Sequence, residues 1–218
     1  GRPRRAMVRP RGRRAERLAE RSGGEGRMKR EDLQEVRPFK TRGAYHRIDA
    51  MSPEERQRGV VCASAGNHAQ GVAFACEALG IRATIFMPEI TPIQKIDRVK
   101  HFGGDQVDIR LVGDSYDDAS AAAEAFCAER RAVFVHPFDD ALTIAGQGTV
   151  GKELHDELGD RLDVVVAGIG GGGLASGIAS YLGQCSPGNR VIAVEPGASP
   201  RLFAATRRGR GGSRGVGT

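Results

Sequence analysis

From residue 60 onward, short apolar runs alternate with longer stretches in which apolar residues recur at helical spacing. The apolar runs predict strands at residues 60–63, 83–87, 106–111, 132–135, 163–167 and 191–194. Between them, helices are predicted at residues 92–102, 116–129, 144–158 and 174–182, and a further one on the stripe Ala69, Val72, Ala73, Cys76 and Leu79. Apolar strands separated by helices of this length indicate a parallel sheet with both faces covered. The pattern therefore predicts an α/β fold.

The two ends of the chain differ in composition from this regular body. Residues 1–30 hold 12 Lys and Arg against 3 Asp and Glu, and residues 201–218 hold 5 against none, so the net charge of +6 comes from the ends. Arginine-rich ends can bind nucleic acid, but aromatic residues do not interleave with these arginines. This favours disordered, solvated tails at residues 1–27 and 201–218, with a short helix at residues 16–22.

Length and cysteine usage narrow the class of protein further. The 218 residues suffice for one large domain or two small ones. No apolar run approaches the length of a membrane span, and no signal peptide is recognised. The cysteines are widely spaced, without a Cys-x-x-Cys pair or a nearby histidine cluster, so we expect free thiols in a reducing cytoplasm and no metal site. A lone carboxylate at a strand end, such as Glu195, is more often solvated or capping than a ligand, and the sequence leaves open whether a metal binds near it.

A glycine-rich turn at residues 168–173 joins an apolar strand to a predicted helix. Backbone N–H groups are free at a helix N-terminus, and the peptide dipoles add partial positive charge there, so this position favours an anion. Glycines also let the backbone approach a phosphate closely. The spacing matches neither the Walker pattern nor a dinucleotide fingerprint. Two interpretations remain open from these residues alone, an anion-binding loop and a tight turn without a ligand.

A polar loop at residues 64–68 also joins a strand to a helix. It reads Ser64-Ala65-Gly66-Asn67-His68, and ligands of open parallel sheets bind at such carboxyl ends of strands. The alternative interpretation is structural. Ser64 and Asn67 can cap the helix, and His68 can make a local hydrogen bond.

Lys40 is the candidate nucleophile, at the start of a helix predicted to run toward Met51. Phe39 and Ala44 provide an apolar setting, which lowers the pKa of a lysine and makes its amine nucleophilic toward an aldehyde. Taken alone, Lys40 is equally an ordinary solvated lysine. An amine, a polar strand-end loop and a phosphate-type turn together favour a phosphorylated aldehyde cofactor held at three points.

Eight motifs extend this reading across residues 28–198. They are Lys29-Arg30-Glu31-Asp32-Leu33-Gln34, Phe39-Lys40-x-Arg42-Gly43-Ala44-Tyr45, Ser64 to Gly71, Phe102-Gly103-Gly104, His136-Pro137-Phe138-Asp139, Gly146-Gln147-Gly148-Thr149, Gly170 to Leu174, and Val194-Glu195-Pro196. In this order they resemble the threonine dehydratases (threonine ammonia-lyases), members of the tryptophan-synthase-β-like, fold type II group of pyridoxal-phosphate enzymes. Jointly the motifs are highly specific.

The resemblance implies a fold of parallel twisted sheets with flanking helices. Residues 28–58 would begin a large cofactor domain, residues 59–142 would form a small α/β domain, and residues 143–200 would return to the large domain. It also implies a cytoplasmic enzyme acting on a small amino acid in isoleucine biosynthesis, and a homo-oligomer for the full-length protein. From the composition we expect no membrane partner and no nucleic-acid partner.

The resemblance also implies a role for each matched position. Lys40 would form the Schiff base with pyridoxal 5'-phosphate beside Phe39 and then move the substrate Cα proton. Asn67 would bond the cofactor's 3′ oxygen, and the loop Ser64, Ala65, Gly66 and His68 would receive the substrate carboxylate. The phosphate would bind the backbone of Gly170, Gly171, Gly172, Gly173 and Leu174. Loss of the β-hydroxyl from L-threonine or L-serine would then yield a 2-oxo acid and ammonia.

Several departures from the family pattern keep alternatives open. Serine racemases of this group place a serine where this chain has Ala65, which disfavours two-base racemisation. Pro38 stands where a serine is usual, and His46 replaces a usual asparagine. The similarity ends near Ser199, so we expect a partial large domain without the serine that partners the pyridine nitrogen. The alternatives are another β-replacing or racemising enzyme of the group, and a truncated, non-catalytic pseudo-enzyme.

Overall fold

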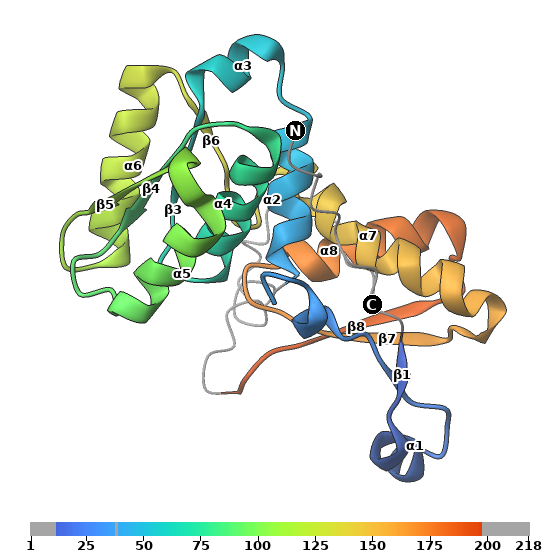
Figure 1. Ribbon diagram of the computed structural model, residues 1–218. Coiled ribbons are helices and arrows are strands. Elements are labelled where there is room, and N and C mark those ends of the chain that lie inside the picture. The colour runs from blue at the N-terminus through green and yellow to red at the C-terminus, as the bar shows by residue number, and fades with distance from the viewer. Residues whose placement is uncertain (1–11, 38, 198–218) are drawn as a thin grey trace.

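The computed structural model describes residues 12–37 and 39–197 (Figure 1). Residues 1–11, Pro38 and the tail predicted for 201–218 lie outside the described residues. In chain order the elements are β1 (Arg13–Arg14), α1 (Glu16–Ser22), β2 (Arg27–Met28), α2 (Lys40–Asp49), α3 (Pro53–Arg58), β3 (Val60–Ala63), α4 (Asn67–Leu79), β4 (Ala83–Met87), α5 (Ile93–Gly103), β5 (Val107–Leu111), α6 (Tyr116–Arg130), β6 (Val133–Phe134), α7 (Ala141–Leu158), β7 (Val164–Gly168), α8 (Gly173–Cys185) and β8 (Arg190–Val194). Within the described residues, no helix is long and apolar enough to cross a membrane.

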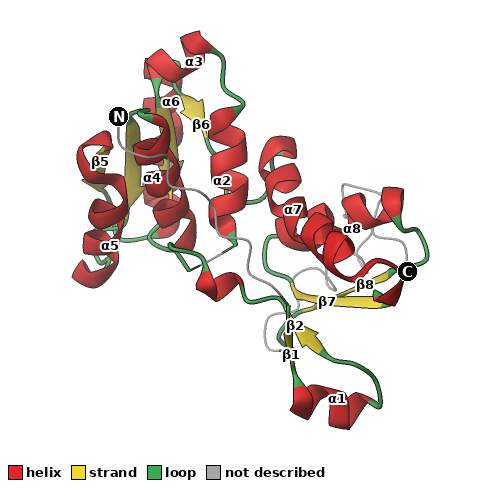
Figure 2. Cartoon of the chain, turned by 45° about the vertical axis from the view of Figure 1, so that its right-hand side comes forward, coloured by secondary structure: helices red, strands yellow, loops and turns green. Residues whose placement is uncertain are grey.

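The predicted α/β alternation is confirmed in a four-stranded parallel sheet with the order β5-β4-β3-β6. Neighbouring strands of this sheet pair in parallel register, with Val60 beside both Ala83 and Val133. Alternate side chains point to opposite faces. One face packs against α4 and α5 to form the main core, which α2 joins by packing on α4, and the other face packs against α6 (Figures 1 and 2). Both faces of this sheet are covered, as the continuous apolar strands predicted.

A second parallel sheet pairs β7 with β8, and here the prediction of two covered faces is wrong. One face packs on α7 and α8 through Val165, Ala167 and Ile178. The side chains that alternate with these are exposed, including Val164 at 42%, Val166 at 65% and Val194 at 51%. The run Val164–Ala167 is equally apolar at every position, so the pattern alone could not show that only one face is covered here.

Element boundaries depart from the sequence prediction where local capping decides them. Helix α7 begins at Ala141, earlier than predicted, because the Asp140 carboxylate accepts a hydrogen bond from the Thr143 N–H at 2.7 Å. Helix α3 was not predicted, although Ser52 and Glu55 form a capping box that the sequence contains. Strand β6 is shorter than predicted and covers only Val133–Phe134.

The N-terminal segment pairs β1 with β2 in an antiparallel ribbon and contains helix α1 at the predicted residues Glu16–Ser22, so the disorder predicted for residues 1–27 is wrong for the described residues 12–27. Beyond β2, Lys29 lies between two carboxylates of α7, with its Nζ 2.9 Å from Glu153 Oε2 and 2.8 Å from Glu157 Oε1. These ion pairs hold the segment against α7.

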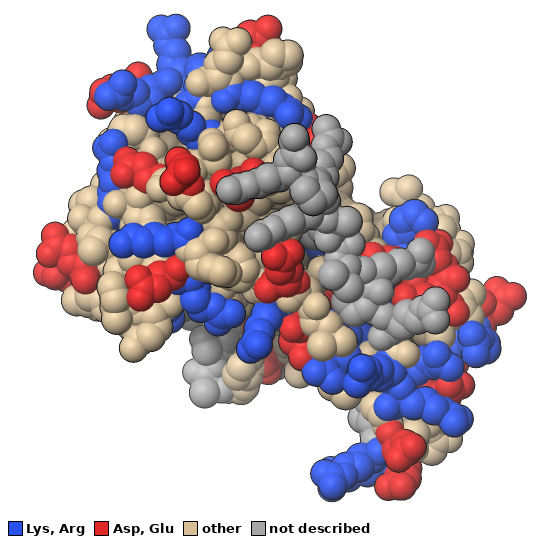
Figure 3. All heavy atoms as spheres, in the orientation of Figure 1, with Lys and Arg blue, Asp and Glu red and all other residues tan. Residues whose placement is uncertain are grey.

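On the face drawn in Figure 3, basic and acidic side chains are intermixed.

A buried arginine continues this network and joins the segment to α2. Arg42 is 2% exposed, and its guanidinium contacts Glu31 at 2.7 Å and Glu153 at 2.8 Å. It also donates to Thr149 Oγ1 at 3.0 Å. Burial by itself would lower the pKa of Arg42, but the hydrogen bonds to Glu31 and Glu153 raise it, so the side chain stays charged. The network therefore sets the position of α2, the helix that begins at Lys40, against α7.

Candidate active site

Lys40 is the first residue of α2 and its side chain is partly buried. Its Nζ donates a hydrogen bond to the Pro137 carbonyl at 3.4 Å and lies 5.9 Å from the centre of the Phe138 ring. Burial lowers the pKa of Lys40, which raises the fraction of neutral, nucleophilic amine. Of the two interpretations of Lys40, the structure favours the apolar setting over an ordinary solvated lysine.

The loop at residues 64–68 lies beside the start of α2. Helix α4 approaches closely because residue 71 is glycine, where a Cβ would lie 3.1 Å from Thr41 Cα and 3.3 Å from the Lys40 carbonyl carbon. The alternative that Asn67 caps α4 is wrong, because the N-cap is Gly66 and no side chain caps this helix. Ser64 Oγ instead accepts the Gly66 N–H at 3.2 Å. The exposed Asn67 side chain is thus left for another role.

His68 is 3% exposed, and its Nε2 donates to the Val135 carbonyl at 2.7 Å. Burial, with smaller contributions from the charges of Lys40 and His136, lowers the pKa of His68 to about 4. The imidazole is therefore neutral at pH 7. The charge of Lys40 affects the pKa of His68, so the two residues lie near each other at the site. The hydrogen bond to the Val135 carbonyl, next to β6, fixes the orientation of the His68 ring.

Acidification should destabilise the fold through His68. Its pKa is about 4 in the folded chain against 6.5 ordinarily, so the unfolded chain takes up the proton first. Stability that is fully present above pH 6.5 is then lost as the pH falls toward 4, by roughly 3 kcal/mol. Urea unfolding at pH 7, 5.5 and 4 measures this for the parent and for His68→Gln, whose amide can still donate to the Val135 carbonyl. The parent's stability relative to the variant should fall across this range, whereas parallel pH curves would contradict the assignment.

The glycine turn follows β7 and leads into α8, as the sequence predicted. Gly172 is the N-cap with φ +90°, a left-handed conformation that side chains rarely adopt. Gly170 has open space where a side chain would stand, since no atom lies within 4 Å of a Cβ placed there. The Ile169 N–H bonds the Val194 carbonyl at 2.8 Å and anchors the start of the turn to β8. The first-turn N–H groups of α8 are those that an intact helix leaves free for an anion.

Phe138 connects the glycine turn to Lys40. A Cβ on Gly171 would lie 2.3 Å from the Phe138 ring, so the ring packs directly on the turn. The same ring lies near Lys40 Nζ and meets His136 edge-on at 4.7 Å between centroids. His136 Nδ1 accepts the Asp139 N–H at 2.7 Å, which holds this connection in a tight turn.

The residues predicted from the sequence to form the site lie close together in the structure. Three further residues, to which the sequence analysis assigned no role, lie beside them. Lys40, the loop 64–68 and the turn 170–173 lie around the β6–α7 connection. Pro137, Phe138 and Gln147 belonged to quoted motifs, but none carries a reactive group that would have singled it out. Leu174 turns its side chain into the core beside β7, which leaves only its backbone for a ligand. The described residues contain no group of three or more His, Cys, Asp or Glu able to hold a metal ion.

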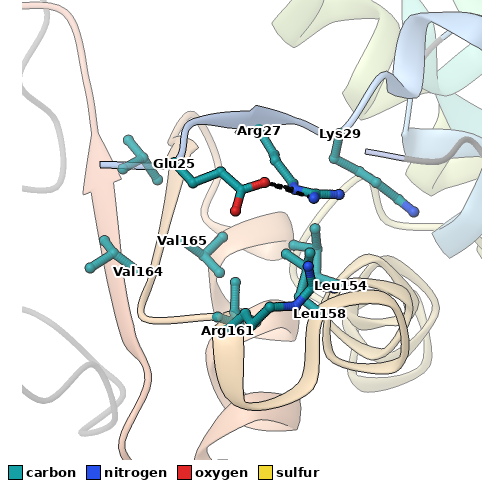
Figure 4. A pocket seen from close by; sticks show the side chains of 10 residues that line it. Glu25, Arg27, Lys29, Leu154, Leu158, Arg161, Val164 and Val165 are labelled. Carbon is teal, nitrogen blue, oxygen red and sulfur yellow. Dashed lines mark hydrogen bonds and ion pairs between the residues drawn. The ribbon is translucent and has the colours of Figure 1, made fainter. Parts of the chain in front are cut away.

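A cavity lies away from these residues. It has a volume of about 150 Å³ and is lined by β2 and its flanks, by the end of α7 and by β7, including Arg27, Leu158 and Val165 (Figure 4). The Arg27 guanidinium is paired with Glu25 at 2.7 Å beside it. None of the converging groups lines this cavity, which lies between the N-terminal segment, the end of α7 and the second sheet.

The converging residues fit a phosphorylated aldehyde. An amine whose pKa is lowered by burial, open glycine N–H groups and the start of α8 are the donor set that such a molecule needs. Residue 173 accepts no larger side chain, because a Cβ there would lie 2.8 Å from Gln147 Oε1. Both amide atoms of Gln147 are buried without a hydrogen-bond partner among the described residues, which leaves polar capacity next to the turn.

Comparison with known proteins agrees with this chemistry. Residues 11–214 match the family of pyridoxal-phosphate dependent enzymes. The chain belongs to this family. It is 48% identical over 196 residues to the biosynthetic L-threonine dehydratase of Bacillus subtilis, covering 90% of this chain and 46% of that protein. It is 47% identical over 183 residues to that of Halalkalibacterium halodurans, covering 84% and 44%. The chain thus spans about half the length of these curated relatives.

Solved structures in this family have the same fold. The processed form of threonine deaminase isoform 2 from Solanum lycopersicum superposes with a TM-score of 0.88 at 40% identity, over 93% of this chain and 55% of that chain. Maize serine racemase superposes with a TM-score of 0.87 at 32% identity, over 94% and 61%. The fold type II arrangement of a pyridoxal-phosphate dependent enzyme is therefore established for the described residues.

Proposed function

We propose that the protein catalyses pyridoxal-phosphate-dependent dehydration and deamination of L-threonine and L-serine to a 2-oxo acid and ammonia. The observation that carries the proposal is the partly buried Lys40 amine, placed by Phe138 beside the glycine turn. The identity of nearly half to biosynthetic L-threonine dehydratases supports threonine as the substrate. Because the chain spans about half of those proteins, the activity is proposed for the protein that contains these residues.

Each residue of the site has its own role in the proposed reaction. Lys40, with its pKa lowered by burial, would hold the cofactor's aldehyde through its amine and, once the substrate's amino group has replaced it there, would accept the proton from the substrate Cα. Backbone N–H groups of residues 170–174 would hold the cofactor's phosphate. The Asn67 amide would hold the cofactor by a hydrogen bond. The start of α4, at residues 64–68, receives the substrate carboxylate.

The bound cofactor would act as an electron sink for the deprotonated Cα. The protein holds the reacting groups in place, and burial keeps His68 neutral and weakly basic beside them, with a pKa of about 4.

A racemase is the second candidate, because maize serine racemase is among the structural neighbours. Racemisation by two bases requires an acid–base group on the face opposite Lys40. Ala65 stands in the loop and packs against the main core, where it offers neither proton donor nor acceptor. We therefore favour elimination over racemisation.

Product analysis tests the proposal. The chain is incubated with pyridoxal phosphate and either L-threonine or L-serine, and 2-oxo acid, ammonia and D-serine are measured. We expect 2-oxo acid and ammonia in equal amounts, with no D-serine. D-serine as the main product would support the racemase, and a product retaining an added nucleophile would indicate a β-replacing enzyme. Cofactor capture without turnover would leave a non-catalytic binding protein.

We also infer the domain organisation and the cellular setting. Residues 28–58 and 143–200 would form part of a large cofactor domain, and residues 59–142 a small one, consistent with the two separate parallel sheets. The four cysteines are free thiols, two of them buried, which supports a reducing cytoplasm. By resemblance to the family, the full protein would be a homo-oligomer.

A further inference from the structure

Gln147 is a buried amide whose hydrogen bonds are not made. It lies on α7 within Gly146-Gln147-Gly148-Thr149 and is 1% exposed. Neither its Nε2 nor its Oε1 has a hydrogen-bond partner in the part of the chain that the structure describes. A buried amide without partners costs free energy, so an apolar side chain of the same shape would serve the fold better. The fold alone gives no reason for an amide at this position.

The surroundings of Gln147 link the two ends of the site. Its Oε1 is the nearest atom to the position of a Cβ on Gly173, the first residue of α8. The Phe138 carbonyl lies 3.0 Å from the same position. On its other side, Gln147 Cγ lies 3.1 Å from the position of a Cβ on Gly43, one turn after Lys40. The amide thus lies against the turn where the proposed function places a phosphate.

We propose that Gln147 is a positioning residue for the phosphate-binding turn. This inference rests on the proposed function, because it assigns the unpaired amide to the bound state of that site. One amide offers both a donor and an acceptor, so it can hold a first-turn N–H of α8 and donate toward a phosphate oxygen at once. The residue thereby orders the N–H groups that bind the anion, at the expense of stability without the cofactor.

The test is Gln147→Met, which keeps an unbranched side chain and removes both hydrogen-bonding atoms. Without cofactor, the melting temperature should stay the same or rise by a few °C, since an unpaired buried amide is removed. The dissociation constant for pyridoxal phosphate should rise about tenfold, the loss expected for one hydrogen bond to a charged group. Binding of pyridoxal, the same aldehyde without the phosphate, should not change.

Thr143→Val provides the matched control. Thr143 lies one turn earlier on α7, is fully buried, and its Oγ1 also lacks a partner among the described residues. It contacts Gly43 but is absent from the atoms nearest Gly173. The control should therefore keep or raise the melting temperature and leave pyridoxal phosphate binding as in the parent.

The outcomes separate the possibilities. Weaker pyridoxal phosphate binding with unchanged pyridoxal binding supports the inference. Equal loss for both ligands, together with a lower melting temperature, would show a purely structural residue and overturn it. Unchanged binding of both ligands would overturn it as well. If the parent itself fails to bind pyridoxal phosphate, the proposed function fails and the inference fails with it.

Discussion

Replacing Lys40 with alanine should abolish covalent capture of pyridoxal phosphate and all turnover of L-threonine. Lys40 Nζ is the amine that the structure holds beside Phe138 and the glycine turn, and burial lowers its pKa. A lysine in water is almost fully protonated at neutral pH, and its ammonium form cannot attack an aldehyde. Removing this amine leaves no other nucleophile in the same position.

Borohydride reduction after incubation with pyridoxal phosphate, followed by peptide mapping, measures capture at each lysine. The parent should carry the label on Lys40, and Lys40→Ala should carry none above background. Lys95→Ala, at an exposed position on α5, is the control and should label as the parent does. The rate of capture should rise with pH to a midpoint below 10.5, the ordinary pKa of lysine. Undiminished labelling or turnover in Lys40→Ala would refute the assigned chemistry.

Arg42→Met should cost about 3–5 kcal/mol of unfolding free energy, the largest stability effect that we expect. The change leaves the carboxylates of Glu31 and Glu153 partly buried and without their main partner. Burial alone raises the pKa of Glu153, but the hydrogen bonds from Arg42 and Lys29 lower it in the parent. Without Arg42, the cost of the buried charges is no longer offset.

Urea unfolding monitored by circular dichroism checks this value. The control is Arg98→Met on the exposed face of α5, which should change stability by less than about 0.5 kcal/mol. Adding Glu31→Gln and Glu153→Gln to Arg42→Met should recover part of the loss, since the unpaired charges are then removed. A loss for Arg42→Met no larger than for Arg98→Met would show that the network contributes little. Loosening of α2 should also move Lys40, so the capture rate should fall with stability.

Most of the fold was predictable from sequence because its signals are local. The apolar runs and helical stripes lie within single elements, and strands β3 and β4 were predicted to the residue. The one-sided second sheet was not predictable, because exposure of Val164 and Val166 depends on what packs on β7 from elsewhere in the chain. An apolar run shows that a strand face can be buried, but it does not show whether another element packs against that face.

The sequence by itself determined the α/β class and the glycine turn and singled out Lys40 as a candidate amine, because each depends on residue type and local spacing. Only the tertiary structure decided which residues these groups contact. Lys40 contacts the Pro137 carbonyl across 97 residues of chain, and Gln147 is buried against Gly173. Such contacts come from the packing of α2, α7 and α8, whose glycines let backbones approach closely. Burial, which lowers the pKa of Lys40 and leaves Gln147 unpaired, exists only once those helices are packed.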